Sequence, residues 1–185
     1  FMPFAKCDKC VTFREKDLEC KDIALKEKLR AEHAVHILEV KQERSAYYAN
    51  RLRGIQKPNE YLSMIIDGAN QAAHAIPHSV EKSHASEGAW KMQLHLMGVI
   101  VHGRGTWAYT CPPHVAQGNN MTIAAIWDTI VAIFKTDGKL PPILFLQLDN
   151  TSKQCKGKYV NAFLGLLVSW GVFAKVIVGF LPVGH

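Results

Sequence analysis

The sequence predicts an α/β protein with a mixed sheet, and three observations lead to that prediction. Apolar runs typical of strands alternate with helical patterns in the second half of the chain. Two apolar runs flank the glycine-containing turn Gly103-Arg-Gly105, which is a hairpin signal. Before residue 58, by contrast, the chain is densely charged and contains no strand pattern. A hairpin followed by alternating helices and strands is typical of a layered fold with both antiparallel and parallel pairing.

The composition and periodicity of the N-terminal part predict a helical arm. Residues 11–57 contain no proline and one glycine, Gly54. Leu25, Leu29, His33 and His36 recur at steps of three and four residues, which indicates one face of a helix. We expect either one long helix or a helical hairpin broken near residues 20–22.

Composition also gives the bounds of the arm. Asp22 is a suitable cap for its main helix, and Gly54 with Pro58 would end that helix. Because the pattern changes after Pro58, we expect two domains: a Cys-x2-Cys segment with the helical arm at 1–57, and an α/β core at 58–185.

The sequence pattern of the core predicts seven secondary-structure elements. We expect strands at 60–66, 93–102 and 106–110, a helix at 121–135, a strand at 143–149, a helix at 159–170 and a strand at 172–181. Asn119 or Asn120 would cap the first of these helices, and Gly138 and Gly171 would follow the two helix ends.

Two aspartates follow buried-looking strands. Tyr61-Leu-Ser-Met-Ile-Ile leads into Asp67, and Ile143-Leu-Phe-Leu-Gln-Leu leads into Asp149. If the first and fourth strands lie side by side and parallel, both carboxylates emerge at one sheet edge, where ligand sites of such folds cluster. Carboxylate oxygens are the ligands that hard divalent cations prefer. Taken singly, each acid has the ordinary alternative of a turn residue that bonds its own backbone.

The five cysteines are odd in number and irregularly spaced, which argues against a disulfide framework and favours a reducing, intracellular compartment. Cys7 and Cys10 alone have metal-ligand spacing. They supply two of the four ligands of a structural zinc ion, and His33 and His36 on one helical face could complete it. The spacer is not that of a common zinc finger, so upstream partners or ordinary thiols stay open as alternatives.

The modest positive net charge is compatible with an anionic partner but does not require one. The formal net charge is +6, and no apolar stretch reaches the length of a membrane span. The basic cluster of Lys153, Lys156 and Lys158 follows Asp149 closely, so it is either a solvated surface or a contact for nucleic-acid phosphates. No glycine-rich phosphate loop follows the first strand, which disfavours a nucleotide-binding protein.

The order of elements, with one acid on the first strand and one after the fourth, resembles the ribonuclease-H-like fold of DDE/D transposases and retroviral-type integrases over about residues 58–185. More narrowly, several spaced motifs resemble a set of eukaryotic proteins thought to derive from mobile elements. These motifs are Phe4-Ala-Lys-Cys7-Asp-Lys-Cys10, Ser45-Ala-Tyr-Tyr48, Ile65-Ile-Asp67-Gly, Gly98-Val-Ile-Val-His-Gly103, Leu146-Gln-Leu-Asp149-Asn150 and Phe180-Leu-Pro-Val-Gly-His185.

That resemblance implies metal-dependent DNA phosphodiester cleavage and strand transfer. Asp67 would bridge two Mg²⁺ or Mn²⁺ ions roughly 3.5–4 Å apart, and Asp149 would hold one of them. A third acid is implied on a helix after the fifth strand, and the sequence ends at His185 before that position. We therefore expect an excised fragment with an incomplete site and no efficient turnover.

The resemblance also implies DNA as partner, a homo-oligomer and a nuclear location. Asn150 and His185 would support the site, and the lysine cluster would contact DNA. The alternative is a domesticated module that binds nucleic acid or protein without catalysis.

Overall fold

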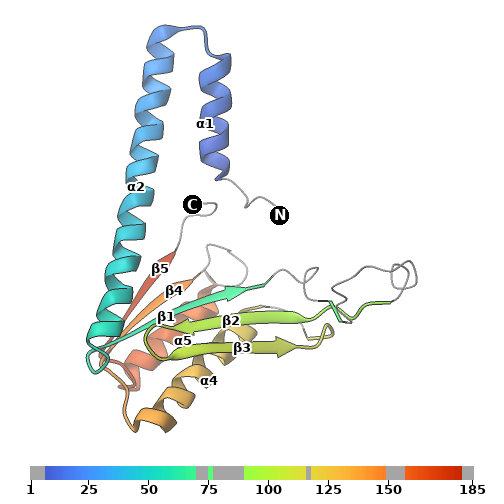
Figure 1. Ribbon diagram of the computed structural model, residues 1–185, viewed down its shortest axis with the longest axis vertical. Helices are drawn as coiled ribbons and strands as arrows, with labels where there is room; N and C mark the ends of the chain where they lie inside the picture. Colours follow the sequence, from blue (N-terminus) through green and yellow to red (C-terminus); the bar gives the residue numbers. More distant parts are fainter. Residues whose placement is uncertain (1–6, 70–74, 77–89, 116–117, 149–156, 181–185) are drawn as a thin grey trace.

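The computed structural model describes residues 7–69, 75–76, 90–115, 118–148 and 157–180. The elements alternate much as the sequence predicts (Figure 1). In chain order they are α1 (Asp8–Glu19), α2 (Ile23–Gln56), β1 (Tyr61–Gly68), β2 (His95–Val101), β3 (Gly105–Cys111), α4 (Asn119–Asp137), β4 (Ile143–Leu148), α5 (Lys158–Ser169) and β5 (Lys175–Phe180).

In the described part of the chain, the strands form one five-stranded sheet in the order β3-β2-β1-β4-β5. β2 pairs antiparallel with both β1 and β3, whereas β4 pairs parallel with both β1 and β5. The expected mixed sheet is confirmed, as is the side-by-side parallel pairing of the first and fourth strands. This is the arrangement that the ribonuclease-H-like expectation requires, with β1 at the centre.

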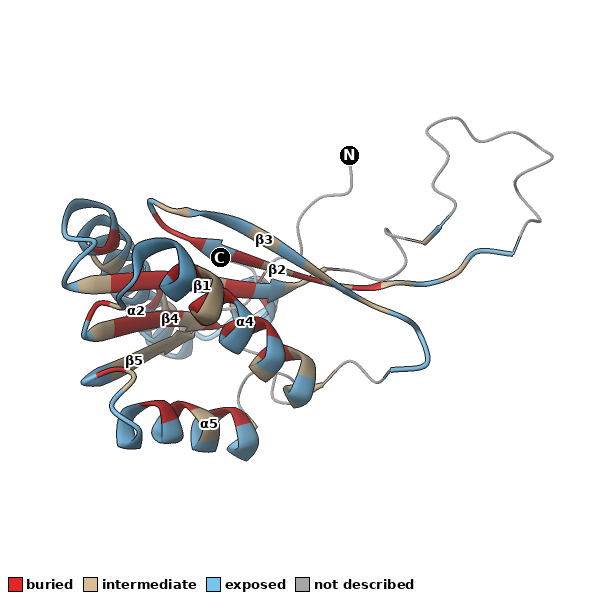
Figure 2. Ribbon diagram, turned by 90° about the horizontal axis from the view of Figure 1, so that it is seen from below, coloured by how far each residue is buried: buried red, intermediate tan, exposed pale blue. Residues whose placement is uncertain are grey.

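One face of the sheet is covered by α4 and α5, and the main core lies between this face and the two helices (Figure 2). Alternate residues of the strands point to this face, as the pleat of a strand dictates. Their apolar side chains are removed from water, which supplies most of the favourable free energy of folding. The strand residues of this layer are Leu62, Met64, Ile66, Met97, Val99, Val101, Leu144, Leu146 and Leu148.

The C-terminal part of α2 packs on β1, and Gly54 permits the close approach. A Cβ built on Gly54 would lie 2.6 Å from the Cβ of Ser63, so any larger residue would push the helix away from the strand. Gly54 is one of the buried residues of α2, and the helix continues past it to Gln56. The expectation that Gly54 ends the helix is therefore wrong, because this glycine serves packing instead.

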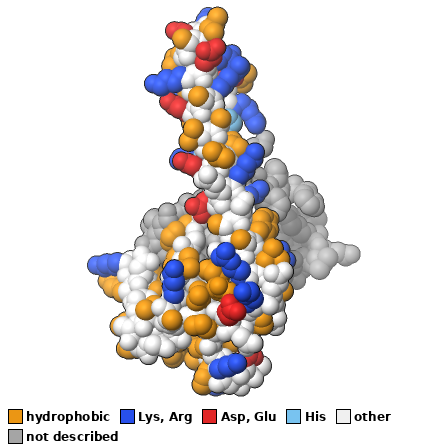
Figure 3. All heavy atoms as spheres, turned by 90° about the vertical axis from the view of Figure 1, so that its left-hand side faces the viewer, with side chains coloured by type: hydrophobic (Ala, Val, Ile, Leu, Met, Phe, Trp, Pro, Cys, Tyr) orange, Lys and Arg blue, Asp and Glu red, His pale blue; other side chains and the backbone are white. Residues whose placement is uncertain are grey.

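Beyond this contact, α2 projects away from the sheet, and α1 lies beside its outer half (Figure 1). Of the two expected alternatives, the helical hairpin is the one observed, with the break at residues 20–22. Asp22 caps α2 by accepting hydrogen bonds from the backbone N–H groups of Ala24 and Leu25, at 2.9 and 3.3 Å. Figure 3 shows that acidic and basic side chains both line the visible face of this arm, so that face carries no continuous basic stripe.

Two boundaries of the core differ from the expected ones. Neither Asn119 nor Asn120 caps α4, because Gly118 is the N-cap and its backbone is extended. β5 begins at Lys175 rather than at Val172, since Gly171 turns the chain with φ +70° and Phe173 is first buried in the core. Gly138 does end α4 in the left-handed conformation, as expected.

None of the described helices combines the length and the apolar character that a membrane span needs.

Candidate functional sites: a sheet edge and a Cys-His cluster

Asp67 lies exposed near the carboxyl end of β1. The preceding residue, Ile66, pairs with Leu148, the last residue of β4, and Asp67 itself pairs with Gly98 of β2. The expected juxtaposition of the two strand ends is thus confirmed up to Leu148. Asp149 lies outside the described residues, and so do Asn150, Lys153, Lys156 and His185.

The pleat of β1 separates Asp67 from the main core. Leu62, Met64 and Ile66 point toward α4 and α5. Because successive side chains of a strand alternate, Asp67 points to the opposite face of the sheet, as Ser63 and Ile65 do. The carboxylate therefore costs little desolvation, since it stands at an open edge instead of inside the apolar layer.

The first turns of α4 and α5 meet each other. A Cβ on Gly157, the N-cap of α5, would lie 2.5 Å from the side-chain Oδ1 of Asn119, the first residue of α4. Because β3 runs in the same direction as β1 and β4, the helices that follow β3 and β4 both begin at the carboxyl edge of these strands. Two helix N-termini, each with partial positive charge, thus share the edge where Asp67 stands.

The charge at these two helix starts is not offset by the helices themselves. Neither described first turn contains an acidic residue. Lys158 opens α5, and its ammonium lies 5.2 Å from the centroid of the Tyr159 ring. This edge can therefore attract anions, phosphates included. Lys158 was predicted from the sequence as a phosphate contact, whereas the paired helix starts were not predicted. The absence of Asp and Glu from both first turns is the sequence signal that could have indicated them.

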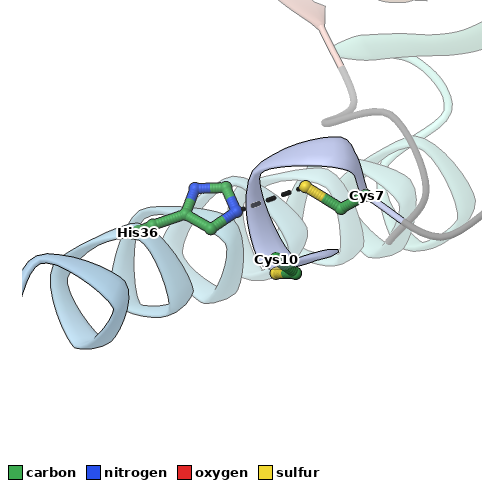
Figure 4. A group of neighbouring side chains, drawn as sticks. All are labelled: Cys7, Cys10 and His36. Atoms are coloured by element: carbon green, nitrogen blue, oxygen red, sulfur yellow. Dashed lines mark hydrogen bonds between the residues drawn. The ribbon is translucent and has the colours of Figure 1, made fainter. Parts of the chain in front are cut away.

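A second group of chemically active side chains lies at the N-terminal end of α1, the end away from the turn to α2 (Figure 4). Cys7, Cys10 and His36 bring one ligand atom each to within 4.8 Å of one another. Cys7 Sγ and His36 Nε2 are 3.4 Å apart, and Cys7 is buried. Burial, and next the hydrogen bond with Cys7, raise the pKa of the Cys10 thiol above its ordinary value. The structure thus brings together three of the four residues considered as zinc ligands.

The fourth, His33, does not join this group. Its ring stacks on Phe13 with a centroid distance of 5.2 Å, and it stacks on His36 at 6.4 Å. Within the described residues, His33 Nε2 is buried and has no hydrogen-bond partner.

A further polar contact joins α2 to the end of β2. The hydroxyl of Tyr47 lies 3.3 Å from Nε2 of His102, and burial lowers the pKa of this histidine. Burial likewise raises the pKa of Tyr47. We interpret this pair as a packing contact, since it lies under the arm and not at the carboxyl edge of β1.

The chain is similar to two solved transposase complexes. The Mos1 transposase paired-end complex with left transposon end has a TM-score of 0.44 at 10% identity, covering 100% of this chain and 61% of that chain. The Mos1 Strand Transfer Complex has a TM-score of 0.42 at 10% identity, covering 100% and 60%. The chain thus spans about three fifths of the length of these proteins. The comparison with curated proteins found no match.

A family match covers β2, β3, α4, β4, α5 and β5, in residues 84–185, and leaves out β1 and the arm. Because these residues make up more than half of the chain, the protein belongs to the family described as a domain of unknown function, DUF7869.

Proposed function

We propose that this chain is the core of a transposase-derived protein that binds DNA and holds divalent cations for phosphodiester cleavage and strand transfer. The observation that carries the proposal is the parallel pairing of Ile66 with Leu148. Each of these residues directly precedes an aspartate, Asp67 or Asp149. The two aspartates therefore directly follow, in the sequence, two residues that pair at neighbouring strand ends.

The donor set fits a hard divalent cation. Carboxylates at the carboxyl edge of parallel strands offer oxygen ligands to Mg²⁺ or Mn²⁺, and Asp67 is exposed enough to accept an ion together with its water. A bound ion of this kind supplies activation of an attacking oxygen and stabilisation of a leaving one. We assign Asp67 and Asp149 as ligands, and Asn150 and His185 as supporting residues.

The same edge is suited to a polyanionic substrate. The helix starts at Asn119 and Gly157 carry partial positive charge, and Lys158 adds a full charge. Lys153 and Lys156 precede it in the sequence, so the proposal assigns all three lysines to DNA phosphates. The domain division at residue 57, a homo-oligomer and a nuclear location belong to this proposal as well.

A Mn²⁺ titration monitored by electron paramagnetic resonance tests the carboxylate pair. We expect the unmodified chain to bind Mn²⁺, and Asp67→Asn and Asp149→Asn each to weaken binding by more than about tenfold, because each removes a charged ligand. Asp128→Asn, an exposed acid on α4, is the matched control and should leave binding unchanged. Circular dichroism would verify that all variants fold.

Equal Mn²⁺ binding by all four proteins would refute the carboxylate site. DNA binding that is salt-sensitive but indifferent to Mn²⁺ and to both aspartates would indicate the non-catalytic interaction module instead.

A further inference from the structure

We propose that Cys7, Cys10 and His36 bind one zinc ion, which fastens the N-terminal end of α1 to the middle of α2. This site is separate from the sheet edge and does not depend on the function proposed above. It lies in the arm, on α1 and α2 (Figure 4), whereas Asp67 belongs to β1 of the core.

The distances fit tetrahedral zinc. With zinc–sulfur and zinc–nitrogen bonds of about 2.3 and 2.0–2.1 Å, a thiolate sulfur and an imidazole nitrogen on one ion lie about 3.5 Å apart. Cys7 Sγ and His36 Nε2 are separated by 3.4 Å. All three donor atoms lie within 4.8 Å of one another, so small side-chain rotations suffice to close the site.

The two cysteines lie together at the start of α1. Cys7 is the N-cap, and Cys10 lies in the first turn. Among the described residues, no side-chain hydrogen bond caps this helix. A Zn²⁺ ion bound here would take both sulfur atoms as thiolates, which is the form of cysteine that binds metal.

The donor set also selects the metal. Two thiolates and one imidazole are soft and borderline ligands, which suit zinc and exclude Mg²⁺ as the preferred ion. Two negative charges balance the charge of the dication, so burial of Cys7 leaves no net charge behind.

The packing of α1 explains what such an ion would do. None of the twelve described residues of this helix is buried, and a helix of this length is marginal on its own in water. At the end of α1 near the turn, an exposed ion pair joins Asp17 to Arg30 at 2.9 Å. Exposed pairs contribute little, so a metal at the opposite end would provide the missing constraint.

A groove open to solvent reaches one member of the cluster, His36. This groove, of about 550 Å³ between α1 and α2, is lined by His36 and by the acids Asp8, Glu32 and Glu39, with Lys9 and Lys16 beside them. Three protein ligands leave the fourth tetrahedral position to water. We leave His33 outside the ligand set, because its ring is stacked on Phe13.

Cobalt substitution tests this site directly. The reduced chain, freed of metal by a chelator and titrated with Co²⁺, should bind one ion per chain with sulfur-to-cobalt charge-transfer absorption and tetrahedral d–d bands. Zn²⁺ should displace the Co²⁺ and abolish both. Cys7→Ser and Cys10→Ser should each halve the charge-transfer intensity, and His36→Ala should retain it. Each of the three should weaken binding by more than about tenfold, since second-shell changes alone cost that much.

Matched controls separate this site from other thiols and from the sheet edge. Cys20→Ser, Cys111→Ser, His33→Ala and Asp67→Asn should leave the spectrum and the affinity unchanged. A wild-type titration without thiolate charge-transfer absorption would overturn the proposal. So would a spectrum that survives Cys10→Ser at full intensity, or one that Cys20→Ser abolishes.

A second measurement tests the role in the arm. Hydrogen exchange of the α1 amides should become faster when a chelator removes the ion, while exchange in the core strands stays the same. Identical exchange of α1 with and without Zn²⁺ would refute the fastening role.

Discussion

The sheet and the arm are stabilised in different ways. Leu146 in β4 is 1% exposed, whereas Leu38 in α2 is 55% exposed. The core thus gains its free energy from burial of apolar surface, but the arm keeps most of its apolar side chains in water. The comparison teaches that the arm depends on a few specific ties: the Gly54 contact at its base, the cap at Asp22 and the cluster at Cys7.

The largest effect should come from the same truncation made in both regions. Leu146→Ala leaves a cavity in the core and should lower the free energy of unfolding by about 2–5 kcal/mol. Leu38→Ala removes an exposed side chain and should change it by less than about 0.5 kcal/mol. Urea unfolding monitored by circular dichroism measures both values. Similar losses for the two variants would show that the arm is as tightly packed as the core.

A smaller effect is expected where the two regions meet. Gly54→Ala places a Cβ 2.6 Å from Ser63, so it should destabilise the protein by about 1–3 kcal/mol through overpacking. Gly165→Ala, on the exposed side of α5 with no atom within 4 Å of the new Cβ, should instead stabilise it by about 0.5–1 kcal/mol. The same unfolding experiment compares them, and a neutral Gly54→Ala would mean that α2 can shift away from β1 without cost.

The smallest effect concerns the Tyr47–His102 contact between arm and core. Burial lowers the pKa of His102 in the folded protein, so the unfolded chain binds the proton more readily. The contribution of this group is present above the unfolded pKa, near about 6.5, and stability falls as pH drops through that value toward the lower folded pKa. In His102→Gln, the decrease in unfolding free energy between about pH 7.5 and 5.5 should be smaller than in the unmodified protein. An unchanged pH dependence would contradict this account.

The part of the fold that depends on local pattern could be predicted from the sequence. Strand periodicity and the Gly103 turn predicted the hairpin, and the apolar runs before Asp67 and Asp149 predicted the pairing of β1 with β4. The cap at Asp22 likewise depends only on neighbouring backbone N–H groups. These features share short sequence separations or a strong periodic signal.

Features set by packing between distant segments could not be predicted. The sequence gives no sign that Gly54 must accommodate Ser63, because only the crossing of α2 over β1 creates that contact. His33 and His36 occupy the same helical face in the sequence pattern, and the approach of α1 decides that His36 meets Cys7. Similarly, Asn119 meets Gly157 and does not cap α4, because the two helix starts converge.

The length of α2 has a mechanical consequence. Between Gly54 and Ile23 the helix extends about 46 Å at a rise of about 1.5 Å per residue. Over that length, a tilt of about 5° at the base of the helix would move the tip by about 4 Å. A small change in how α2 packs on the sheet would therefore become a displacement of several ångströms at the turn between α1 and α2.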